Sequence, residues 1–181
     1  MPRKLNFHTL LGPLVALLMV LTLLLVSATP AFADDDPPKP IPGLGKVSNA
    51  DLTSMYKKLR AWYDSQAIVI RESYELAKQF QTVIDFYKKK GRDVTGLETA
   101  LVRFNDEIIK AEAARVYTNS LFTRNAGFNG FFVVLDRSLA AQTILEARTS
   151  LKGTHMDLEE AVRNLKRDYN AWRRWMLGYQ N

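Results

Sequence analysis

Apolar residues recur at helical spacing through the chain after residue 48. A seven-residue pattern runs from Leu52 to Lys90, and fourteen of the seventeen positions on one side of it are apolar or aromatic. This pattern predicts one long helix that buries a broad stripe. Every position on the opposite side is charged: Lys57, Asp64, Arg71, Lys78 and Asp85. The core-side positions before Lys90 are Leu52, Met55, Tyr56, Leu59, Trp62, Tyr63, Gln66, Val69, Ile70, Ser73, Leu76, Ala77, Phe80, Val83, Ile84 and Tyr87.

Both ends of this first helix carry boundary signals. Ser48 followed by Asp51 resembles a capping box, with a hydroxyl for free backbone donors and an acid in the first turn. Lysines at 88–90 precede Gly91; cations favour the negative end of a helix, and glycine can take a positive φ beyond it. No proline follows residue 42, so the rest of the chain is free to be helical.

A second helix is predicted to begin near Asp93 or Thr95 and to end around Arg124. Its predicted buried face comprises Leu97, Leu101, Phe104, Ile108, Ala111, Leu121 and Phe122. Residues 125–130 are rich in turn formers. The apolar run at 131–135 has the composition of a strand, but the chain offers it no partner strand. We therefore expect a loop that packs against the helices.

Asp136 is a suitable N-cap for a third helix. Its predicted core positions are Ala140, Ile144, Ala147, Leu151, Leu158, Ala161, Leu165, Trp172 and Trp175. Gly153 followed by residues 154–157 resembles a helix stop and a new capping box, although the heptad register passes through unchanged. The predicted fold is all-α: an elongated antiparallel three-helix bundle, or a four-helix bundle if the last helix breaks at Gly153.

The first thirty-three residues have the pattern of a secretory signal. Arg3 and Lys4 precede an uncharged run at 10–26, and Ala31-Phe32-Ala33 supplies the small residues that a signal peptidase reads. Cleavage after Ala33 is our interpretation, and an uncleaved anchor helix is the alternative, because seventeen residues is the lower edge of what spans a bilayer. Residues 34–48 then form a predicted disordered Pro/Gly linker before a helical domain at 49–181.

Composition narrows the class of protein. The full chain has 25 Lys and Arg against 19 Asp and Glu, or +6, and loss of the predicted signal removes Arg3 and Lys4, leaving 23 against 19, or +4. The absence of cysteine excludes a disulfide scaffold, a thiolate metal site and a cysteine nucleophile. An exported chain of this kind has to be stabilised by its hydrophobic core.

Little catalytic chemistry is visible in the sequence. Beyond the predicted signal there is one histidine, His155, so one chain cannot assemble a two-histidine metal site. Common nucleophile and phosphate-loop motifs are absent. Adjacent acids at 106–107 and 159–160 point in different directions on a helix, and Glu159 has the spacing to pair with Arg163. We predict no enzyme activity, no cofactor and no metal site.

A basic and aromatic stretch near the C-terminus is the best candidate for a contact surface. It comprises Arg163, Lys166, Arg167, Tyr169, Trp172, Arg173, Arg174 and Trp175. If the second helix is about thirty residues long and the third about forty, the third overhangs by roughly 15 Å and leaves two tryptophans and four cations partly uncovered. The alternative is that the tryptophans belong to the core and the cations complement the negative end of the helix.

Several segments resemble a family of uncharacterised exported helical proteins of bacteria. The matching residues are those at 91–98 (Gly-Arg-Asp-Val-Thr-Gly-Leu-Glu), Ala126-Gly127-Phe128, Asp136-Arg137 and Trp172-Arg173-Arg174. The resemblance covers most of the chain after the predicted signal, and its motifs are mostly helix boundaries. It implies a signal peptide followed by long helices and carries no assigned activity.

These features lead to three hypotheses for an extracytoplasmic protein that is periplasmic, cell-surface or secreted. The first is a non-catalytic envelope protein that acts through contact with an unknown protein partner or by self-association. The second is a periplasmic holdase of the Spy type, although the Leu-Thr-x-x-Gln motif appears only as residues 52–56, without the glutamine. The third is binding of anionic lipid or envelope polymer through the C-terminal stretch. We expect no nucleic acid partner.

Overall fold

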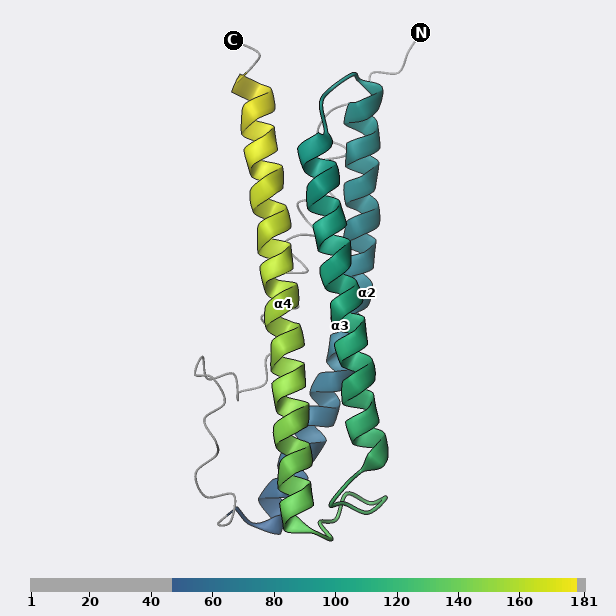
Figure 1. Cartoon of the computed structure of the whole chain (residues 1–181), viewed down its shortest axis with the longest axis vertical. Helices are drawn as coiled ribbons and strands as arrows, with labels where there is room; N and C mark the ends of the chain where they lie inside the picture. Colours follow the sequence, from purple (N-terminus) through teal and green to yellow (C-terminus); the bar gives the residue numbers. More distant parts are fainter. Residues whose placement is uncertain (1–46, 179–181) are drawn as a thin grey trace. The chain divides into compact units, whose positions relative to one another are not determined.

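A computed structural model describes residues 47–178, which form an all-α, three-helix bundle (Figure 1). The helices are α2 (Asn49–Lys89), α3 (Thr95–Arg124) and α4 (Arg137–Gly178). The predicted all-α fold is confirmed. The predicted signal at 1–33 and nearly all of the predicted linker lie outside the described residues. No helix within 47–178 is long and apolar enough to cross a membrane.

The helix boundaries follow the capping signals. Ser48 and Asp51 form a reciprocal cap, in which Asp51 N donates to the Ser48 hydroxyl at 3.1 Å and Ser48 N donates to the Asp51 carboxylate at 3.3 Å. Gly91, just beyond α2, has a φ of 68°. Asp136 caps α4 through a 3.0 Å bond from Leu139 N to its Oδ1. These local hydrogen bonds satisfy backbone groups that the helix leaves unpaired at its ends.

The described chain divides into two compact units, and each contains part of all three helices. Unit 1 comprises 69–109 and 157–178, and unit 2 comprises 47–68 and 110–156. In unit 1, Phe80 and Tyr87 of α2 contact Tyr169 and Trp172 of α4, respectively, so α2 and α4 run in the same direction. The short turn at 90–94 reverses α3, which runs antiparallel to both.

The heptad pattern of α2 matches its burial. Every predicted core position before Lys90 is buried or half-buried, and the charged positions of the opposite side are all exposed. The predicted buried face of α3 is also buried throughout. Burial of this apolar area is the main stabilising contribution in both units.

Helix α4 is continuous through Gly153, so the three-helix prediction holds and the four-helix alternative does not. The hydroxyl of Thr154 donates to the Ser150 carbonyl at 2.9 Å, one turn back, and Thr154 is buried. A hydroxyl used in this way does not cap a new helix. The interior glycine is therefore accommodated at the modest cost in helix stability that glycine carries.

The connection between α3 and α4 forms a loop at 125–136, here called the α3–α4 loop. It contains a single antiparallel bridge between Phe128 and Val134, which is not part of a strand. Both bridge residues are buried, and Phe132 packs partly against the core of unit 2. Phe131, Val133 and Leu135 are instead exposed, so the expectation of a loop packed against the helices is correct for only part of this segment.

Candidate functional site

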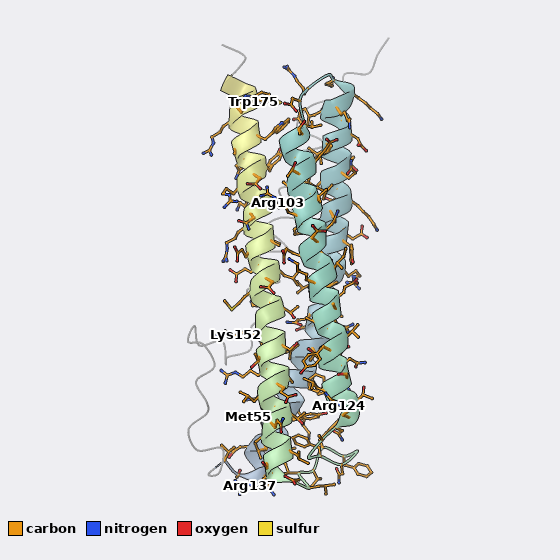
Figure 2. All side chains as sticks on the ribbon, viewed as in Figure 1. Met55, Arg103, Arg124, Arg137, Lys152 and Trp175 are labelled. Carbon is orange, nitrogen blue, oxygen red and sulfur yellow. The ribbon has the colours of Figure 1, made fainter. Side chains whose placement is uncertain are left out.

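A solvent-open groove of about 400 Å³ lies in unit 1 beside the last turns of α4. The turn before α3 and the facing sides of α3 and α4 supply its lining residues: Asp93, Gly96, Arg103, Asp168, Ala171, Trp172 and Trp175. Trp175 is 46% exposed, and Figure 2 shows it near the C-terminal end of α4. We call this feature the Trp175 groove. Its walls combine indole rings with two carboxylates and one guanidinium group.

Asp93 shapes one end of the groove. Its Oδ1 accepts a 3.0 Å hydrogen bond from Thr95 N, and hydrogen bonding to Thr95 lowers the pKa of the Asp93 carboxyl below its ordinary value. Its backbone carbonyl accepts a 2.8 Å bond from Trp172 Nε1. The turn before α3 is thereby attached to α4, and the Asp93 carboxylate is committed to capping α3.

Ion pairs hold the polar side of the groove. Arg103 Nη2 lies 2.8 Å from Asp168 Oδ2, and Arg167 Nε lies 3.3 Å from Asp168 Oδ1. Both arginines are largely exposed, so these pairs contribute little to stability. Both carboxylates of the groove therefore already have partners, Asp93 at the start of α3 and Asp168 between two arginines.

Two members of the predicted contact surface belong to the core. Tyr169 and Trp172 are buried against Phe80 and Tyr87 of α2, and the Tyr87 and Trp172 rings lie 4.7 Å apart. The expectation that Trp172 is partly uncovered is therefore wrong. Helix α2 reaches as far as the last turns of α4 in this unit and covers the side that α3 leaves open. For Trp172, the core alternative holds, and for Trp175, which is 46% exposed, it does not.

The other members of the predicted surface are exposed. They are Arg163, Lys166, Arg167, Arg173, Arg174 and Trp175. Arg163 forms the predicted ion pair with Glu159 at 2.6 Å. We call these six residues the C-terminal surface. It shares this stretch of α4 with the Trp175 groove but extends to another side of the helix, because Arg173 projects about 160° away from Trp175 at 100° per residue.

Unit 2 contains a small buried polar group. Gln66 Nε2 donates to the Leu151 carbonyl at 2.7 Å, while Gln66 Oε1 and Trp62 Nε1 are buried without a hydrogen-bond partner. The buried His155 ring lies edge-on to Trp62, with ring centroids 6.2 Å apart. Within residues 47–178, no three His, Cys, Asp or Glu side chains are grouped to hold a metal ion.

Sequence reasoning missed two exposed apolar features. One is the α3–α4 loop, where Phe131 is 86% and Leu135 is 72% exposed. The other is the outer side of α3, where Val102, Ile109 and Val116 are each more than half exposed. The seven-residue spacing of the second group was a usable signal, because residues seven apart share a helix face. The loop run is apolar at every position, so its pattern did not indicate which side chains face outward.

The described residues thus form a three-helix bundle that carries a small groove with charged and aromatic walls. Comparison with protein families, curated proteins and solved structures found no match.

Proposed function

We propose that this chain is a non-catalytic, exported protein of the cell envelope or cell surface that acts through contact with another protein. The observation that carries the proposal is the Trp175 groove together with the exposed cations of the C-terminal surface. Tryptophan and arginine are the residues most enriched where binding energy concentrates in protein interfaces. A groove beside a half-exposed indole supplies a place for one anchoring side chain.

The charge of the surface suggests the chemistry of the partner. Five of its six residues are cations, and the ion pairs with Glu159 and Asp168 neutralise only part of that charge. A partner with an acidic surface that wraps around the last turns of α4, and with one aromatic or aliphatic side chain for the groove, fits both features. The acids would speed association, and the apolar side chain in the groove would slow dissociation.

Two variants test the proposal. The Arg173→Glu/Arg174→Glu variant reverses charge on the C-terminal surface. Gly96→Leu adds a side chain at the lining of the groove, where a Cβ meets no atom within 4 Å. Proteins from the envelope fraction of the producing cell are captured on each of the three chains and quantified by mass spectrometry. At least one protein captured by the wild type should be captured at least about tenfold less by both variants. Capture that is equal for all three chains would reject the proposal.

A binder of anionic lipid or envelope polymer is the second candidate, favoured by the same exposed cations. Such a ligand needs charge but does not need the groove. Binding to phosphatidylglycerol vesicles or to a soluble polyanion should then fall with charge reversal and with added salt, while Gly96→Leu binds like the wild type. This pattern, with no protein lost by the groove variant, would favour the second candidate over the first.

A holdase is the third candidate, and the exposed apolar residues of α3 favour it: Val102, Ile109, Val116 and Tyr117. Apolar surface of this kind can bind an unfolded chain. The test is suppression of aggregation of a reduced, unfolding client at near-equal molar ratio. A variant with serine at positions 102, 109 and 116 should lose that effect. If wild type and variant both fail to suppress aggregation, the holdase proposal is wrong.

A further inference from the structure

We propose that the α3–α4 loop is a lipid-contacting tip, which inserts Phe131, Val133 and Leu135 into the interfacial region of a bilayer. These side chains are 86%, 54% and 72% exposed, respectively. Leu139, in the first turn of α4, is 46% exposed and adds to the same apolar group. The site lies in unit 2 and is independent of the Trp175 groove and the C-terminal surface.

The loop backbone holds these side chains outward. Phe132 has a φ of 65°, a conformation that is uncommon for a bulky residue, and it directs the Phe132 side chain to the core beside Tyr56. The hydroxyl of Thr53 donates to the Phe132 carbonyl at 3.0 Å and fixes this position. With Phe132 and Val134 turned inward, their neighbours along the chain face solvent.

The backbone donors of the apolar residues are already paired inside the loop. The side-chain oxygen of Asn129 accepts from Phe131 N and Val133 N, both at 2.9 Å. Phe132 N donates to the Asn129 carbonyl, and Leu135 N donates to the Gly127 carbonyl, each at 2.9 Å. An irregular segment can enter an apolar medium only when its backbone groups are satisfied, because each unpaired N–H costs several kcal/mol. This loop meets that condition for four donors.

The paired backbone of the loop and its flanking cations favour a bilayer as the occupant of this apolar group. Four partly exposed side chains present on the order of 400 Å². A stable protein–protein interface buries roughly 800 Å² on each partner, a little over half of it apolar, so the area alone fits either occupant. A bilayer surface takes up a few apolar side chains and tolerates cations beside them. Arg124 and Arg137 flank the loop at the end of α3 and the start of α4, and both are exposed (Figure 2).

The test uses the absence of cysteine from the chain. In the full chain, Phe131→Cys provides one thiol for a polarity-sensitive fluorophore, so the signal reports this position whatever the remainder of the chain does. Mixed with phosphatidylcholine vesicles, the probe at 131 should emit at shorter wavelength, and nitroxide-labelled acyl chains should quench it at least about twofold. Adding Val133→Ser and Leu135→Ser should return the emission of the probe at 131 toward its aqueous wavelength and remove most of the acyl-chain quenching.

The matched control is Val116→Cys, because Val116 is 71% exposed on α3 in the same unit. The probe at 116 should keep its aqueous emission. Circular dichroism should show that each labelled chain is folded. The proposal is wrong if the probe at 131 does not respond to phosphatidylcholine or phosphatidylglycerol vesicles, or if both positions respond equally. A shift that grows with protein concentration and resists lipid quenching would assign the loop to a protein partner and overturn the lipid proposal.

Discussion

Gln66 of α2 is a polar side chain buried in a largely apolar helix face. Gln66 occupies a heptad core position and is 1% exposed. Its amide nitrogen is bonded to the Leu151 carbonyl, but its amide oxygen is not bonded. A buried acceptor without a partner costs about 1–3 kcal/mol, while a single neutral hydrogen bond contributes about 1 kcal/mol. Gln66 therefore contributes little net stability, despite its central position.

We expect Gln66→Met to leave the free energy of unfolding unchanged or to raise it by up to about 1 kcal/mol. Methionine has a similar length and removes the unbonded acceptor, and the Leu151 carbonyl remains within the hydrogen-bond ladder of α4. Urea unfolding followed by circular dichroism would measure the change. A loss of more than about 1 kcal/mol would contradict this account and would indicate that the amide oxygen has a bound partner such as an ordered water.

Gly127 is the residue on which the α3–α4 loop most depends. Its φ is 84°, and a Cβ built there would lie 2.1 Å from Ala140 N and 2.7 Å from the Asp136 carbonyl oxygen. Gly127→Ala should therefore lower the free energy of unfolding by roughly 2–4 kcal/mol, from the left-handed backbone and the clash together. Gly130→Ala is the matched control, because a Cβ there meets no atom within 4 Å. Urea midpoints that shift equally for the two variants would refute this explanation.

Among the three helices, α2 could be predicted best from the sequence. Its core-side and charged positions separate cleanly because one pattern runs the length of the helix. At the end of α4 the pattern placed Trp172 and Trp175 alike in the core, yet Trp172 is buried and Trp175 is 46% exposed. Burial there depends on how far α2 and the turn at Asp93 extend, which is a tertiary property. The spacing of apolar residues in the sequence therefore could not predict the groove.

The outward orientation of the loop side chains could not be predicted for a different reason. The run Phe131–Leu135 is apolar at every position, so no alternation of apolar and polar residues shows which side chains face outward. The outward side chains are instead determined by the positive φ of Phe132 and by the hydrogen bond from Thr53, 79 residues earlier in the chain. A contact so distant in sequence leaves no local pattern.

The interior glycine of α4 leads to a prediction at the scale of the helix. Gly153 lies in continuous helix, and a Cβ added there meets no atom within 4 Å. Gly153→Ala should raise the free energy of unfolding by about 0.5–1 kcal/mol and the Tm by about 1–4 °C. Differential scanning calorimetry would measure both. Destabilisation instead would mean that α4 requires a bend at this position.

For the whole molecule, buried tyrosines make stability depend on alkaline pH. Burial raises the pKa values of Tyr56, Tyr87 and Tyr169 above the ordinary value of 10.0. The folded state therefore holds the phenolic protons more tightly than the unfolded state does. The stability that results is complete below pH 10 and is lost as pH rises through the folded-state pKa values. Hydrogen bonding to Glu98 likewise raises the pKa of Lys88, which acts in the same direction.

The free energy of unfolding should consequently be level between about pH 7 and 9 and should fall above pH 10, by at most about 1.4 kcal/mol per pH unit for each buried tyrosine. Urea midpoints taken from pH 8 to pH 12, with tyrosinate absorbance recorded in parallel, would show this decline. Tyr169→Phe keeps a buried ring but has no proton to lose, so its decline should be shallower. Tyr117→Phe, at a 49% exposed position, should follow the wild-type profile. If Tyr169→Phe and Tyr117→Phe gave the same profile, burial of Tyr169 would not be the source of the alkaline instability.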